Sequence, residues 1–69
     1  MLLDTRGKKC PEPLVMFRRA IKKMKQGEKI EIVGDDERSS AEIVMAADEL
    51  GMKVLELSGD KEWKIVIKK

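Results

Sequence analysis

Cys10 is the only cysteine in this 69-residue chain and its one strong nucleophile. Pro11, Glu12 and Pro13 follow it directly. Proline is well tolerated in the first turn of a helix, where its missing N–H would have no partner. The two prolines therefore predict a stiff helix start, and leave nearby amides such as that of Glu12 as candidates to hold an anion on sulfur.

Nearby charges and the helix dipole bear on the protonation of Cys10. The positive end of a helix favours the thiolate. Three cations on the N-terminal side of Cys10 also favour the thiolate: Arg6, Lys8 and Lys9. The negative charge of Glu12 opposes them. We therefore expect the pKa of the Cys10 thiol to be lowered, although the sequence does not define the size of the shift. A free cysteine is also often a small buried residue, but polar and basic flanks favour exposure here.

The composition excludes several classes of site. The chain has no histidine, which rules out Ser-His-Asp and Cys-His catalysis and the usual zinc sites, so no metal and no cofactor are expected. One cysteine cannot form an internal disulfide. Charged residues make up 41% of the chain with a net charge of only +2, which does not favour a dedicated nucleic-acid binder. No signal peptide or apolar stretch of about 20 residues is present, so we expect a cytoplasmic protein.

The hydrophobic pattern predicts the elements that carry Cys10. Leu2 and Leu3 indicate a short strand, and a helix follows at about 11–26, ended by Gly27. The buried face of that helix has a spacing of three and four residues: Leu14, Phe17, Ile21 and Met24.

The second half of the chain continues with a strand at 29–33 and a second helix capped by Ser39 or Ser40. Its expected buried face is Ile43, Ala46, Ala47 and Leu50. A third strand at 52–57 and a last strand containing Trp63, Ile65 and Ile67 should form an antiparallel hairpin. The order β-α-β-α-β-β predicts an α+β two-layer sandwich. It would be one domain over 1–69, with a mixed four-stranded sheet and both helices on one face.

The segment from Asp4 to Pro13 resembles the TusA/SirA-like family of small sulfur-carrier proteins. That family has a Cys-Pro-x-Pro motif after an acidic-x-x-Gly segment. Here Cys10-Pro11-Glu12-Pro13 follows Asp4, Arg6 and Gly7. The similarity extends over nearly the whole chain, including Gly27-Glu28, Asp35-Asp36 and Gly51.

The resemblance implies a fold like the C-terminal domain of translation initiation factor three. It also implies that Cys10 carries a persulfide, received from a cysteine desulfurase or another donor and passed to an acceptor protein. Family branches look tied to tRNA thiolation, sulfur oxidation, molybdenum-cofactor sulfuration or selenium metabolism. Two departures bear on partner choice: Lys8 replaces a commonly apolar residue, and the second helix lacks a proline after Glu42-Ile43. We therefore assign no branch, donor, acceptor or oligomeric state.

The first helix also presents a basic face, here called the basic helix face: Arg18, Arg19, Lys22 and Lys23. It could dock an acidic partner, or an RNA, with Met16 as an apolar contact. Asp35-Asp36 is interpreted as a turn rather than a metal or acid–base pair. The alternatives to a sulfurtransferase-like carrier are a regulatory or RNA-binding module with an incidental cysteine, and a redox-sensing thiol, which the absence of a resolving cysteine weakens.

Overall fold

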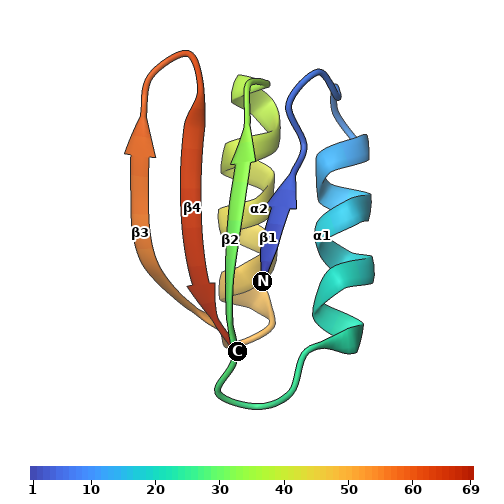
Figure 1. The fold of residues 1–69 in the computed structure, drawn as a ribbon, viewed down its shortest axis with the longest axis vertical. Helices are drawn as coiled ribbons and strands as arrows, with labels where there is room; N and C mark the ends of the chain where they lie inside the picture. The colour runs from blue at the N-terminus through green and yellow to red at the C-terminus, as the bar shows by residue number, and fades with distance from the viewer.

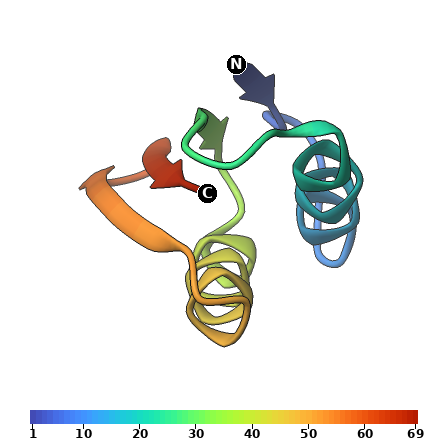
Figure 2. The ribbon, with the colours of Figure 1, turned by 90° about the horizontal axis from the view of Figure 1, so that it is seen from below.

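The computed structural model describes residues 1–69 and places six elements in the expected order. They are β1 (Leu2–Asp4), α1 (Glu12–Lys23), β2 (Lys29–Gly34), α2 (Glu37–Glu49), β3 (Lys53–Gly59) and β4 (Trp63–Lys68), as drawn in Figure 1. The strands form one sheet, and Figure 2 shows both helices on the same side of it. The predicted α+β two-layer sandwich is confirmed. Neither helix has the length and apolar composition needed to cross a membrane.

The sheet is mixed, with the strand order β1-β2-β4-β3. β1 runs parallel to β2, and β4 is antiparallel to both β2 and β3. The expected hairpin of the last two strands is therefore present, and β4 lies between β2 and β3. The parallel pairing places the carboxyl ends of β1 and β2 at the same edge of the sheet. The loop before α1 and the start of α2 both leave from that edge (Figure 1).

The core lies between the sheet and the helices. Phe17 and Ile43 project into it from the two helices and are fully buried, against a layer of isoleucines from β2 and β4: Ile30, Ile32, Ile65 and Ile67. The opposite face of the sheet carries charges, as expected. Lys64 Nζ lies there 3.5 Å from a Glu31 oxygen and 3.6 Å from a Glu56 oxygen. The alternation of apolar and charged side chains along the strands thus gives the sheet one buried face and one solvent-exposed face.

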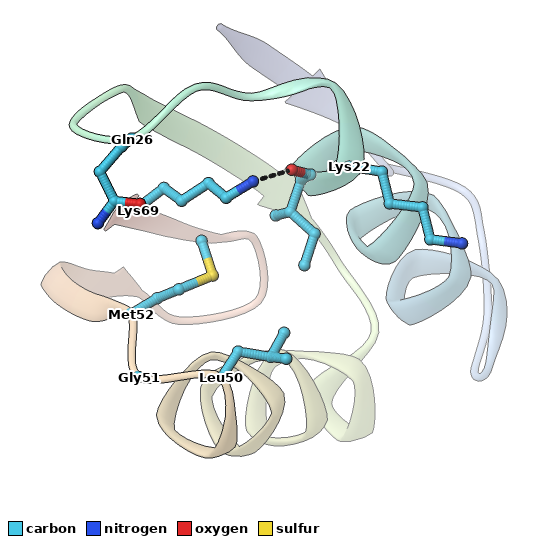
Figure 3. Close-up of a pocket in the computed structure, with 7 residues that line it drawn as sticks. Lys22, Gln26, Leu50, Gly51, Met52 and Lys69 are labelled. Carbon is cyan, nitrogen blue, oxygen red and sulfur yellow. Dashed lines mark hydrogen bonds between the residues drawn. The ribbon is translucent and has the colours of Figure 1, made fainter.

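The end of α1 differs from the sequence prediction. The helix ends at Lys23, because Met24 turns into an extended conformation (φ −83°, ψ 145°) while its side chain stays buried. Lys69 Nζ donates hydrogen bonds to the carbonyls of Ile21 at 2.8 Å and Met24 at 2.9 Å. A cation from the far end of the chain therefore supplies further hydrogen bonds to carbonyls at the end of the helix, and Figure 3 shows one of them as a dashed line from Lys69.

The ends of α2 and β3 also differ. α2 begins at Glu37 after Asp36, so Ser39 lies inside the helix, where its buried hydroxyl donates to Asp36 Oδ2 at 2.7 Å. Leu50, predicted to be buried, is 56% exposed, because the helix ends at Glu49 and the chain turns away through Gly51 at φ +74°. β3 begins at Lys53, one residue later than predicted, and extends to Gly59.

Candidate functional site

The segment between β1 and α1 is attached to the end of β2 at three points. The N–H and the hydroxyl of buried Thr5 both donate to the Val33 carbonyl, at 2.7 and 2.8 Å. The Gly7 N–H donates to the Asp35 carboxylate, with both oxygens at 3.2 Å. The Cys10 N–H donates to Asp36 Oδ2 at 2.7 Å. Asp35 and Asp36, interpreted as a turn, therefore also fix the loop that presents the cysteine.

Cys10 is exposed and lies one residue before Pro11, the residue that caps α1. The Cys10–Pro11 peptide bond is cis. Pro13 is fully buried in the first turn of the helix, so the motif is anchored by its second proline while its first residues face solvent. This geometry agrees with the predicted exposure of the thiol at a rigid helix start.

The thiol contacts a carboxylate from the other helix. Cys10 Sγ donates to Glu42 of α2, with both carboxylate oxygens at 3.2 Å. Glu42 is half-buried, and it is not among the residues that the sequence singles out as functional. Asp36 was likewise expected only in a turn. These two carboxylates are 32 and 26 positions from Cys10, so only the tertiary fold brings them to it.

The pKa of the Cys10 thiol is raised, which corrects the predicted lowering. The thiol hydrogen bond to Glu42 is the largest cause, followed by desolvation and then by the negative charges of Glu42 and Asp36. Arg38 acts in the opposite direction but does not outweigh them. The protonated thiol is therefore the favoured form in the isolated protein.

Two of the three cations expected to favour the thiolate, Arg6 and Lys8, form ion pairs with other residues. Arg6 donates to both carboxylate oxygens of Asp4, at 3.1 and 2.9 Å, and lies 3.6 Å from Glu62. Lys8 Nζ lies 3.9 Å from Glu12. The Glu12 N–H, a candidate to hold an anion on sulfur, instead donates to the Lys9 carbonyl at 2.8 Å. Arg6, Lys8 and the Glu12 N–H thus stabilise a thiolate at Cys10 less than their closeness in sequence suggests.

The basic helix face is solvent-exposed along α1, on the helix that begins beside Cys10. Met16 is half-buried in a shallow hollow that it shares with Met1, Leu3 and Ala20, next to β1. A separate hollow at the other end of α1 lies between Lys22, Leu50 and Lys69 (Figure 3). Cys10 does not line that second hollow, so the candidate chemistry stays at the Cys10 end of the molecule.

Comparison with known proteins agrees with this geometry. The sequence profile described as "Sulfurtransferase TusA" matches residues 1–69. The chain belongs to the TusA sulfurtransferase family. A relative of this TusA-family chain from Thermotoga maritima is 44% identical over 68 residues, covering 96% of this chain and 86% of its own. Another, from Archaeoglobus fulgidus, is 31% identical over 70 residues, covering 100% and 96%. Both carry the name "Putative sulfur carrier protein".

The fold of this TusA-family chain is shared with a solved structure. The crystal structure of a SirA-like protein from Desulfitobacterium hafniense superposes with a TM-score of 0.82, covering 97% of this chain and 93% of that one. The sequence identity is 18%, so this likeness bears on the fold alone. It confirms the predicted resemblance to TusA/SirA-like proteins at the level of architecture.

Proposed function

We propose that this protein is a sulfur carrier that holds one sulfur as a persulfide on Cys10. The exposed Cys10 thiol at the start of α1, in a chain of the TusA family, is the observation that carries this proposal. A carrier needs one accessible sulfur nucleophile and surfaces for docking, and it needs no histidine base. The residues Asp4, Arg6, Gly7, Pro11, Glu12 and Pro13 would support the thiol by shaping its loop.

The transfer is an exchange between sulfur atoms. The Cys10 thiolate attacks the terminal sulfur of a donor persulfide, and the donor's S–S bond breaks as the new bond to Cys10 Sγ forms. The electron pair of the broken bond stays on the donor cysteine, which leaves as a thiolate. A thiolate of the acceptor then attacks the terminal sulfur on Cys10 in the same manner. Neither step changes the overall redox state, so no external oxidant or reductant is needed.

The partners of such a relay are a donor protein, such as a cysteine desulfurase, and an acceptor protein. We propose that the basic helix face and Met16 contribute to their docking, because they lie on the helix that begins two residues after Cys10. A reducing compartment such as the cytoplasm keeps a single thiol free for this chemistry. The eventual destinations would include tRNA thiolation or molybdenum-cofactor sulfuration.

Intact-mass spectrometry tests the carrier function directly. The protein is incubated with a cysteine desulfurase and free cysteine, and its mass is measured before and after reduction with a thiol. Wild type should gain one sulfur that reduction removes, and Cys10→Ser should gain none. Cys10→Ser should also melt close to wild type, because the side chain is exposed. Equal sulfur gain in both proteins would exclude Cys10 as the carrier residue.

A further inference from the structure

The carboxylate of Glu42 lies directly beside the Cys10 thiol. Both of its oxygens lie 3.2 Å from Cys10 Sγ, and its side chain is half-buried in the second turn of α2. The molecule has five ion pairs, and none of them includes Glu42. Its negative charge therefore faces the sulfur and forms no ion pair with a lysine or arginine of this chain.

This contact acts on the protonation of Cys10. A thiol can donate its proton to a carboxylate, but a thiolate at the same place would be repelled by it. The other charged groups around the sulfur do not reverse this: Asp36 adds a second negative charge, and Arg38 compensates only in part. On the loop itself Lys8 is paired with Glu12, and Lys9 forms no ion pair. The free protein consequently holds its nucleophile in the unreactive form.

We propose that Glu42 is a lock on Cys10, and that a sulfur-transfer partner opens it with a lysine or arginine side chain that pairs with Glu42. This inference rests on the carrier function proposed above. In the complex the partner's cation neutralises the Glu42 carboxylate and takes its oxygens away from the thiol. The thiol proton then passes to solvent, Glu42 stays ionised in the new ion pair, and the thiolate attacks the terminal sulfur of the donor persulfide.

The lock also specifies the partner's surface. A matching partner carries a cation next to its own reactive sulfur and acidic side chains that face the basic helix face of α1. A protein with only the acidic groups would dock without releasing the thiolate. The arrangement thus confines the reactivity of Cys10 to complexes that present both charges, and it protects the free thiol from unrelated electrophiles.

Charged thiol reagents test the lock without a known partner. Aminoethyl methanethiosulfonate brings a cation to the thiol, sulfonatoethyl methanethiosulfonate brings an anion, and iodoacetamide is neutral. Wild type should react faster with the cationic reagent than with the anionic one, and Glu42→Gln should reduce this rate ratio severalfold. Iodoacetamide should react several times faster with Glu42→Gln than with wild type at neutral pH, because the thiol pKa falls when the charge is removed.

Glu49→Gln is the matched control, because it makes the same chemical change on the same helix, seven residues and about 10 Å further along. It should behave as wild type with all three reagents. An unchanged rate ratio in Glu42→Gln, or no faster reaction with iodoacetamide, would overturn the lock. Circular dichroism verifies that Glu42→Gln is folded. The rate at which wild type reacts with iodoacetamide, measured as a function of pH, gives a second test. A midpoint at or below the ordinary pKa range of cysteine would also overturn the lock.

The lock and the carrier function fail in distinguishable ways. A wild-type protein that takes up no sulfur from a desulfurase refutes the carrier function, whatever the reagent series shows. If wild type takes up sulfur but Glu42→Gln leaves the ratio of the cationic to the anionic reagent rate unchanged, the carrier function stands and the lock is refuted. If both hold, a desulfurase should add sulfur to Glu42→Gln with less dependence on its own cationic residues than it shows with wild type.

Discussion

The carboxylate of Asp36 accepts the backbone N–H of Cys10 at 2.7 Å, and this bond joins the reactive loop to the start of α2. The same oxygen accepts the Ser39 hydroxyl at 2.7 Å, and the Asp36 carbonyl accepts Trp63 Nε1 at 2.9 Å. One residue therefore links the Cys10 loop, the second helix and the last strand. The position of the thiol next to Glu42 depends on this link.

Replacing Asp36 should loosen the Cys10 loop. Asp36→Ala removes the acceptor of the Cys10 N–H but keeps the backbone carbonyl that binds Trp63, so the fold should persist while the loop opens more often. Amide hydrogen exchange measured by NMR should be faster at Cys10. Ser39→Ala is the control, because it removes only the serine hydroxyl from Asp36. If Ser39→Ala accelerated exchange at Cys10 as much as Asp36→Ala, the direct bond would not be what holds the loop.

Replacing Phe17 should destabilise the core of the protein. Phe17 is 0% exposed at the centre of the α1 face, and Phe17→Ala should lower the free energy of unfolding by about 3–5 kcal/mol. Denaturant unfolding followed by circular dichroism measures this change. Val15→Ala, at a position 41% exposed on the same helix, should change it by no more than about 0.5 kcal/mol. Similar effects at both positions would contradict the assignment of the buried face.

Reversing the charge of the basic helix face should slow sulfur transfer. Replacing Arg18, Arg19, Lys22 and Lys23 with glutamate should reduce the association rate with an acidic partner, and the wild-type rate should fall with added salt. The control carries the same change of charge on the exposed sheet side and the β3–β4 turn, at Lys29, Lys53, Lys61 and Lys68. It should transfer sulfur almost as fast as wild type.

The same two variants separate the carrier from an RNA-binding module. Binding to generic RNA should be weak in wild type, because one exposed basic helix offers few phosphate contacts and the aromatic residues Phe17 and Trp63 are buried. A salt series of RNA binding measures this. Tight wild-type binding that is lost only in the α1 variant, with sulfur transfer unchanged, would favour the RNA-binding alternative.

The Asp4–Arg6 pair should be visible in acid titration. Hydrogen bonds and the charge of Arg6 lower the pKa of Asp4 to about 2. Because the folded pKa is depressed, the pair stabilises the protein above the unfolded value of about 3.9, and this contribution is lost as the pH falls towards about 2. NMR titration should find the pKa of Asp4 raised in Arg6→Ala and unchanged in Arg19→Ala. An Asp4 pKa unaffected by Arg6→Ala would show that the pair does not persist in solution.

Much of the fold could be predicted from local patterns. The spacing of Phe17, Ile21 and Ile43 on the helices, and the alternation of Trp63, Ile65 and Ile67, correctly placed the core. These patterns are reliable because the period of each element determines which residues share a face. Element ends were less predictable. Leu50 matches the helical period of α2 but lies beyond its end, where period no longer determines burial.

For the site, the sequence by itself determined the candidate nucleophile, and its predicted Pro-x-Pro helix start and exposure are confirmed. The tertiary structure decided its protonation. Arg6 and Lys8 are neighbours of Cys10 in the chain, yet they pair with Asp4 and Glu12. The parallel pairing of β1 with β2 brings the Cys10 loop next to the N-terminal half of α2, from which Glu42 reaches the sulfur. The pKa of a thiol follows from the charges nearest to it in space, and those charges lie 26 and 32 positions away along the chain.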